Sequence, residues 1–373
     1  MRMTDTHDQR HQEWTQAIEA DTEAVAPALH LDHGTTTPAA AGGTPWRTVV
    51  ESMVFPLFFA VMFALCYVSA FHSPTPRDVE VVVVGPETAT SALVDRLAPT
   101  VGDKFALETA TDAAGALDRL QNREIAGVIE LGSTMNLHIA SAEGTMRVQA
   151  VEGLAQPLAA AQGVDLNLVD HAPLAADDPT GTGLFYLVMV CTIVGYLTIT
   201  VLSQVAPRMR LRQQLSVLGV MAVVGVLAAY LVSAIFVGFY GASFATSLAM
   251  LAVVIAYTII VGLVSILVNR VFGKAAIMVV MVLMIFVNFP SAGGAFPADF
   301  LPGFWSMLSH FWIGAGAVDA VRSIIYFGST GVGHGLLVLA GWFVVTAVLL
   351  GLTQLRKSDA DADASPAPQH AVS

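Results

Sequence analysis

The spacing of the long apolar runs is the feature that most constrains how this chain can fold. One run stands alone near the N-terminus, a polar stretch of about a hundred residues follows, and then several more runs come close together. A helix needs about 20 apolar residues to cross the hydrocarbon core of a bilayer. The pattern predicts six membrane spans, in Val49–Phe71, Gly183–Val205, Leu215–Gly238, Leu248–Val268, Ala275–Val287 and Gly335–Leu355.

The composition agrees with a polytopic α-helical membrane protein. The chain is 55% apolar and only 12% charged, with a mean hydropathy of +0.67, far from the values of soluble domains. The fifth run is short, and a full span there must include Asn288. We expect a disordered cytoplasmic tail over 1–45, a first transmembrane helix over 46–71, a five-helix bundle over 183–355 and a disordered tail over 356–373.

The basic residues near the span ends predict the orientation, because cytoplasmic loops carry an excess of Lys and Arg. The loop after the second run holds Arg208, Arg210 and Arg212, and the loop after the fourth holds Arg270 and Lys274. The loops predicted on the other side of the membrane carry few cations: residues 240–247 have none, and residues 291–334 have only Arg322. Both termini are therefore predicted to be cytoplasmic in the plasma (inner) membrane, with residues 72–182 on the outer face.

The segment 72–182 shows alternating strand and helix patterns, in the order βαβαββαβ. The strands are expected at 79–84, 105–109, 126–131, 137–140 and 164–169, and the main helices at 88–97, after Asp112 as a cap, and at 145–162. These elements predict one small extracytoplasmic α/β domain.

The charge of this segment limits its partners. Between His72 and Thr182 there are sixteen acidic and six basic residues, a net charge of −10. An anionic surface disfavours nucleic acid, so we expect none as a partner. Cys66 and Cys191, the only two cysteines, both fall in predicted spans, which excludes a disulfide framework in the outer domain.

The sequence lacks the common motifs for nucleotide binding, metal binding and nucleophilic catalysis. The chain has no Gly-x-x-x-x-Gly-Lys-Ser/Thr loop for nucleotide phosphates, no His-Glu-x-x-His, no Gly-x-Ser-x-Gly and no cysteine pair with metal spacing. We therefore expect no enzyme activity, no metal and no cofactor. Glu51 is the one acid within a predicted span, and it lies in the first turn, four residues from Arg47. Its position indicates an acid that stabilises the helix N-terminus at the cytoplasmic interface and pairs with a nearby residue.

The segment before the last span combines helix breakers, aromatic residues and a charged pair. Gly293 and Pro297 interrupt the preceding helix, and Asp319 and Arg322 are spaced to pair at i, i+3. Short helices over 296–328 are expected at the outer membrane interface. Their aromatic patch comprises Phe296, Phe300, Phe304, Trp305 and Trp312.

Residues 291–305 (SAGGAFPADFLPGFW) and the stretch GAVDAVRSIIYFG from Gly316 resemble the corresponding region of type-2 ABC exporter permeases, in the branch of the phage infection protein. Residues 112–131 resemble the outer-domain pattern of that branch. Residues 177–196 are similar to actinobacterial relatives of the fungal nitrosoguanidine-resistance membrane proteins.

The resemblance implies an export permease, a homodimer or permease heterodimer in the lipid bilayer, that moves a hydrophobic, amphipathic or toxic compound or an envelope component. A separate ATP-binding subunit would hydrolyse ATP and dock on a coupling loop at Pro207, Arg208, Arg210 and Arg212. The exit segment would comprise Phe296, Pro297, Asp299, Trp305, Asp319 and Arg322. Two alternatives remain open: a non-transporting envelope protein whose outer domain binds or assembles a partner complex, and a proton-driven drug exporter.

Overall fold

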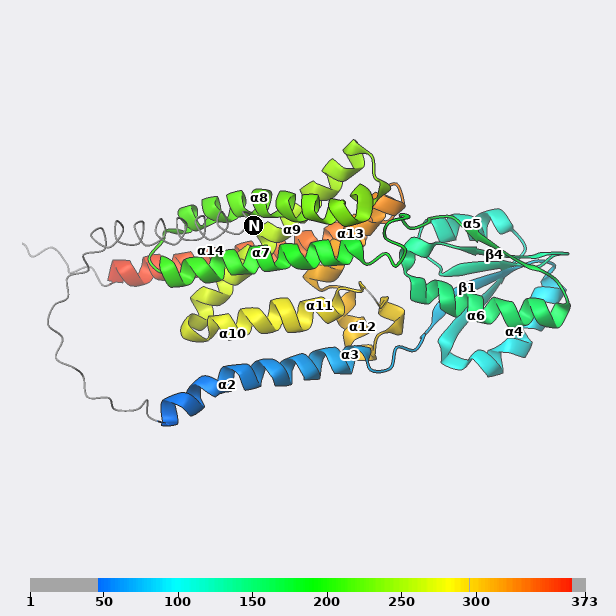
Figure 1. The fold of residues 1–373 in the computed structure, drawn as a ribbon, viewed down its shortest axis with the longest axis horizontal. Helices are drawn as coiled ribbons and strands as arrows, with labels where there is room; N and C mark the ends of the chain where they lie inside the picture. The colour runs from blue at the N-terminus through cyan, green and yellow to red at the C-terminus, as the bar shows by residue number, and fades with distance from the viewer. Residues whose placement is uncertain (1–45, 295, 364–373) are drawn as a thin grey trace, which may run out of the picture. The chain divides into compact units, whose positions relative to one another are not determined.

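The computed structural model describes residues 46–294 and 296–363 (Figure 1). The tail predicted over 1–45 lies outside these residues. From Phe59 onward the chain forms one compact unit.

The chain is mostly helical. Among the described residues, five helical segments are long enough and apolar enough to cross a membrane. This supports the prediction of a helical membrane protein. The predicted fourth and fifth runs fall in a single segment rather than in two separate ones. The five segments are Trp46–Phe71, Gly183–Val205, Leu211–Gly241, Phe244–Ser291 and Val332–Leu355.

The long segment Phe244–Ser291 has 48 residues, which as one straight helix would be about 70 Å long. It is broken after α9 (Phe244–Phe272) by a 3₁₀ turn at Gly273–Ala275, where Gly273 has φ +52°. A side chain with a Cβ is strained at that φ. Beyond the turn, α10 (Ala276–Met281) packs back against α9. A π-helical stretch, η7 (Val282–Val287), and α11 (Asn288–Ser291) complete the segment.

The bundle is built on close helix contacts. The helix α7 (Gly183–Val205) packs against α8 (Leu211–Val237) and α9, and α9 also packs against α14 (Val332–Asp363) (Figure 1). A Cβ at Gly195 of α7 would lie 2.7 Å from the Thr258 carbonyl oxygen of α9. Gly195 therefore serves close packing of α7 on α9, as small residues do between membrane helices.

The structure bears on the sequence predictions for the C-terminal tail and for the two cysteines. The helix α14 continues to Asp363, so the expected disordered tail is wrong for residues 356–363, which extend the last helix; the rest of that tail lies outside the described residues. Cys66 and Cys191 are both buried and free. The first span comprises α2 (Trp46–Phe63), a π-helical stretch η2 (Ala64–Val68) and α3 (Ser69–Phe71).

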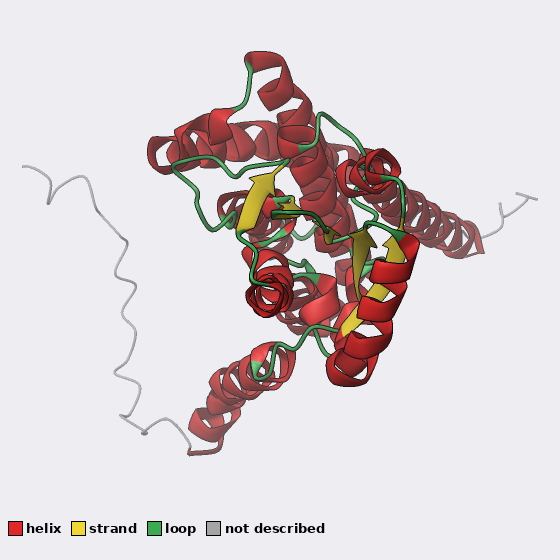
Figure 2. Cartoon of the chain, turned by 90° about the vertical axis from the view of Figure 1, so that its right-hand side faces the viewer, coloured by secondary structure: helices red, strands yellow, loops and turns green. Residues whose placement is uncertain are grey.

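Residues 72–182 contain the predicted α/β fold. Five strands form one sheet in the order β2-β1-β3-β4-β5, drawn as yellow arrows in Figure 2. All neighbouring strands are parallel except the antiparallel pair β3–β4, which the turn at Gly132 joins. The strands are β1 (Val79–Val84), β2 (Phe105–Ala110), β3 (Gly127–Glu130), β4 (Met135–Ile139) and β5 (Leu166–Asp170).

The helices of this domain also confirm the predicted order. They are α4 (Glu87–Val101), α5 (Ala113–Gln121) and α6 (Thr145–Gln162). Asp112 caps α5, because its carboxylate accepts from the backbone N–H groups of Ala114 and Gly115 at 3.0 and 2.9 Å. Gly163 ends α6 in the left-handed conformation, at φ +67°.

The valine run of β1 is buried on both faces of the sheet. Val79, Val81 and Val83 belong to an apolar cluster with α4 and α6 residues, whereas Val82 and Val84 belong to a cluster with Ala116 and Leu120 of α5. A central strand covered on both sides requires such a continuous apolar sequence.

The segment 296–328 forms three short helices: the 3₁₀ turn η8 (Ala298–Phe300), α12 (Gly303–Ser309) and α13 (Ile313–Tyr326). The helix α13 is almost wholly buried and packs against α7, α9 and α14. The expected interfacial aromatic patch is wrong for Phe300, Trp305 and Trp312, which are buried; Phe304 is exposed. Tertiary packing covers rings that the sequence alone places at a membrane surface.

Candidate functional site

A cluster of charged residues joins the α/β domain to the segment 296–328, and Arg123 is at its centre. Arg123 follows the last turn of α5 with φ +66°, a left-handed conformation that is uncommon for a residue other than glycine or asparagine. Its guanidinium donates to Asp319 Oδ1 of α13 at 2.7 Å and also to Ser323 Oγ and Glu143 Oε1. The same guanidinium lies 5.0 Å from the ring centre of Phe327.

Glu143 holds two arginines together. It ends the 3₁₀ turn η4 (Ser141–Glu143) before α6 and is only 6% exposed. One carboxylate oxygen pairs with Arg123, and the other accepts from Arg147 of α6 at 2.8 Å. Both oxygens therefore have a cationic donor, which a buried carboxylate requires.

Arg147 makes the second connection to the segment 296–328. Its Nε donates to both carboxylate oxygens of Asp299 in η8, at 2.9 and 3.2 Å. Nearby, Arg77 donates from its backbone N–H to the Asp299 carbonyl oxygen at 2.9 Å and from its side chain to the Leu301 carbonyl oxygen at 2.6 Å. The loop before β1 and the start of α6 thus both hold the short stretch from Asp299 to Leu301.

The mutual attraction in this cluster overcomes the cost of burial. Burial disfavours the carboxylate of Glu143, but Arg123, Arg147 and Arg322 lower its pKa below the ordinary value. Burial likewise opposes the charge on Arg123 and Arg147, yet Glu143 with Asp319 raises the pKa of Arg123, and Asp299 with Glu143 raises that of Arg147. Glu143, Arg123 and Arg147 are therefore all charged at neutral pH.

The predicted ion pair between Asp319 and Arg322 is wrong. Asp319 pairs with Arg123 instead, because the docked domain brings a guanidinium closer than the neighbour on the same helix. Arg322 lines a cavity of about 130 Å³ together with Arg123, Glu143, Arg147 and Asp319. Three arginines and three carboxylates, counting Asp299, therefore meet at one place.

Apolar contacts reinforce the charged cluster. Phe300 of η8 is 2% exposed and belongs to the core of the α/β domain on the α4 and α6 side of the sheet. Tyr326 and Phe327 pack on the α5 side. Gly144, at φ +131°, has no room for a Cβ, which would lie 2.9 Å from Pro297 Cγ. The segment 296–328 is thus held by both faces of the outer domain.

A separate polar network lies within the bundle. Asn288 of α11 is fully buried; its Nδ2 donates to Tyr257 Oη at 3.0 Å and its Oδ1 accepts from the Gly314 backbone N–H at 2.9 Å. Thr192 of α7 bonds to the same Tyr257 hydroxyl. Asn288, which the fifth predicted span had to include, is satisfied because three other helices, α7, α9 and α13, supply its partners.

The predicted coupling loop lies at the other end of α7. Pro207, Arg208, Arg210 and Arg212 line a cavity of about 1300 Å³, together with polar residues from the ends of α9 and α14. Arg270, in the last turn of α9, and Lys274, in the turn that follows it, line the same cavity. Two basic loops that the sequence separates are therefore brought together.

The remaining predicted site residues have separate surroundings. Trp305 Nε1 donates to Ser69 Oγ of α3 at 3.1 Å, and Phe296 stacks on Phe71 with ring centres 4.8 Å apart. Glu51 is exposed on α2, and no ion pair with Arg47 forms in the part of the chain that the structure describes. Over the same residues, no three His, Cys, Asp or Glu side chains are grouped to hold a metal ion.

Sequence reasoning missed Arg123, Glu143 and Arg147. The one local signal is at Arg123, which occupies the position after a helix where glycine or asparagine is usual. Glu143 and Arg147 lie at i, i+4, a spacing that exposed helix pairs share, so nothing local distinguishes them. Their common partners lie far away in the sequence.

Comparison of the chain with models of known protein families, with curated proteins and with solved structures finds no match. The fold therefore defines a class: a helical membrane protein with a small α/β domain that is joined to the bundle by a buried charged cluster.

Proposed function

We propose that this chain is the permease subunit of an ABC-type exporter, and that it moves a hydrophobic, amphipathic or toxic compound or an envelope component out of the cytoplasm or inner leaflet. In this proposal the chain crosses the plasma membrane six times, with α9 and the segment from α10 to α11 as separate passes. Both termini are cytoplasmic and the α/β domain is extracytoplasmic. Two permease chains, identical or related, form the transport unit.

One observation carries the proposal: helix α13 is in contact with both the outer domain and the helices that end at the basic loops. Its Asp319 pairs with Arg123 of the α/β domain. Its buried face packs against α9 and α14, and a Cβ at Gly335 of α14 would lie 2.5 Å from the Gly316 carbonyl oxygen of α13. A movement of α9 or α14 would therefore be transmitted to the outer domain.

The arrangement of charge supports the proposed orientation. The helix α7 starts directly after the α/β domain and ends at the loop that holds Arg208, Arg210 and Arg212. With 23 residues, α7 is about 35 Å long, enough to cross the hydrocarbon core once. The domain and the basic loops are then on opposite sides, and basic loops face the cytoplasm.

Affinity purification of the full chain from its native membranes in mild detergent tests the proposal. We expect an ATP-binding subunit to co-purify in a stoichiometric amount and to hydrolyse ATP. A variant with Arg208→Glu and Arg210→Glu in the coupling loop should lose this subunit, whereas Arg96→Glu on the exposed face of α4 should retain it. Reproducible absence of an ATP-binding subunit would overturn the proposal in favour of an envelope assembly protein. Efflux driven by a proton gradient without ATP would favour the third class.

A further inference from the structure

The large cavity at the end of the bundle carries an unbalanced positive charge. Five cationic side chains line it: Arg208, Arg210, Arg212, Arg270 and Lys274. No acidic residue is among its lining residues. At about 1300 Å³ the cavity is large enough for a ligand of considerable size.

These cations lack anionic partners within the described part of the chain. None of the five takes part in an ion pair with the side chains described from Trp46 to Leu355. Arg270 is held by neutral groups only, since it donates to Thr353 Oγ1 at 3.3 Å and, with the Gln354 amide turned to satisfy both groups, to the Gln354 oxygen at 2.7 and 2.8 Å. Like charges that share a cavity repel one another, so a bound anion would stabilise the arrangement.

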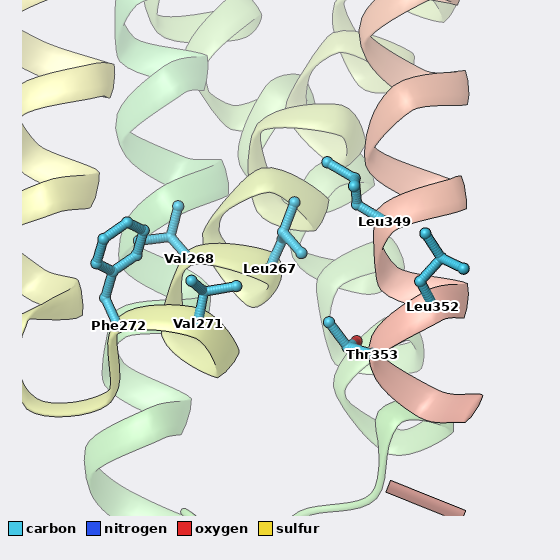
Figure 3. Close-up of a pocket in the computed structure, with 7 residues that line it drawn as sticks. All are labelled: Leu267, Val268, Val271, Phe272, Leu349, Leu352 and Thr353. Atoms are coloured by element: carbon cyan, nitrogen blue, oxygen red, sulfur yellow. The ribbon is translucent and has the colours of Figure 1, made fainter. Parts of the chain in front are cut away.

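An apolar groove adjoins the basic cavity. Figure 3 shows side chains of α9 and α14 that line a hollow of about 290 Å³, among them Val271, Phe272, Leu349 and Leu352. These four side chains are between 43% and 59% exposed. Thr353 lines both the groove and the cavity. The two hollows are thus neighbours, one cationic and one apolar.

We propose that this pair of hollows binds an anionic glycerophospholipid from the leaflet at this end of the bundle. The phosphate headgroup lies among the arginines and Lys274, and one acyl chain lies in the groove between α9 and α14. Guanidinium groups suit phosphate because they donate two parallel hydrogen bonds, and basic pockets between membrane helices bind such headgroups.

The combination of the two hollows selects the lipid over other anions. Free phosphate would match the cavity but leave the groove unfilled. The acidic residues at the end of α14, Asp359, Asp361 and Asp363, would also match only the charge. An anionic lipid has both a charged and an apolar part, and the membrane supplies it at high local concentration.

Native mass spectrometry of the purified full chain in detergent tests this proposal, with phosphatidylglycerol and diphosphatidylglycerol as ligands and phosphatidylcholine for comparison. We expect the anionic lipids to remain bound and phosphatidylcholine to dissociate. The variant with Arg208, Arg210 and Arg212 each changed to Gln should lose about a hundredfold in affinity, on the basis of about fivefold for each cation near an anionic headgroup. The matched control, Arg96→Gln with Lys104→Gln on the outer domain, should bind as the wild type does.

A second variant tests the groove. Val271→Trp should fill it and weaken binding of long-chain lipids at least tenfold, without an effect on dihexanoyl analogues of the same headgroup. Val220→Trp, at an exposed site of α8 outside both hollows, should have no effect. Because Val271→Trp leaves the arginines of the coupling loop in place, it should still capture the proposed ATP-binding subunit.

Four results would overturn the proposal. The first is unchanged lipid binding in the arginine variant, and the second is equal binding of phosphatidylcholine. The third is binding of inorganic phosphate or dihexanoyl lipid as tight as that of the long-chain lipid, which would assign the cavity to a soluble phosphate. The fourth is lipid binding that occurs only after Asp359, Asp361 and Asp363 are changed to Asn, which would assign the cavity to these acidic residues at the end of α14. All are measured on the chain alone, so they are independent of the transport proposal.

Discussion

Charged side chains are paired with opposite charges at one end of the bundle and lack such partners at the other. Where the α/β domain meets the segment 296–328, three arginines and three carboxylates meet, and two of the arginines have ion pairs. At the other end, five cations line one cavity with no carboxylate among its lining residues. Paired and buried charges hold two parts of a protein in a fixed arrangement, whereas unpaired cations at a surface cavity remain available for a ligand or a partner.

The largest expected effect comes from removing the carboxylate at the centre of the paired cluster. Glu143→Gln leaves Arg123 and Arg147 without their shared anion in a buried site, and should destabilise the protein by about 3–5 kcal/mol. Thermal and denaturant unfolding of the full chain in detergent measure this. Glu108→Gln is the matched control, because its pair with Arg119 is half exposed and should cost about 0.2–1 kcal/mol. Equal effects of the two substitutions would contradict a special role for the buried cluster.

Acid should remove the same stabilisation. The pKa of Glu143 is lowered in the folded protein, so its contribution is fully present above the unfolded pKa of about 4.3 and is lost as the pH falls through the folded value. The difference in unfolding free energy between wild type and Glu143→Gln should be constant from pH 8 to pH 5 and shrink below about pH 4. A difference that does not depend on pH would show that the charge of Glu143 contributes nothing.

A double-mutant cycle distinguishes the observed partner of Asp319 from the one that its spacing predicted. The coupling energy between Arg123 and Asp319, from Arg123→Gln, Asp319→Asn and the double variant, should be about 1–3 kcal/mol. The cycle between Arg322 and Asp319 should give the smaller value, because those two side chains form no ion pair. A larger coupling for Arg322 would restore the pairing along the helix.

The smallest expected effect concerns the unpaired end. Arg210→Gln and Arg212→Gln remove no ion pair within the described residues, so each should change the free energy of unfolding by less than about 0.5 kcal/mol in lipid-free detergent. The same unfolding assay used for Glu143 measures this. A loss of several kcal/mol would mean that these arginines are structural, and the contrast between the two ends would disappear.

Local sequence determined the elements of this protein. The apolar runs predicted helices that can cross a membrane, except that the fourth and fifth fall in one segment, and the break at Gly273 lies between those two runs. The strand over 79–84 and the Asp112 cap were predictable because each depends on neighbours a few positions away. The α/β order was therefore predictable almost strand by strand.

Tertiary structure alone decided how these elements meet. Arg123 and Asp319 are separated by 196 positions, and no period or motif connects them. The helix spacing of Asp319 and Arg322 indicated a local pair, but a docked domain supplied a nearer guanidinium, and the same docking buried Phe300. Likewise each basic loop was visible in the sequence, yet only the fold of α7, α9 and α14 placed both in one cavity. Local pattern fixes what each segment can become, whereas contacts between distant segments depend on which surfaces are buried together.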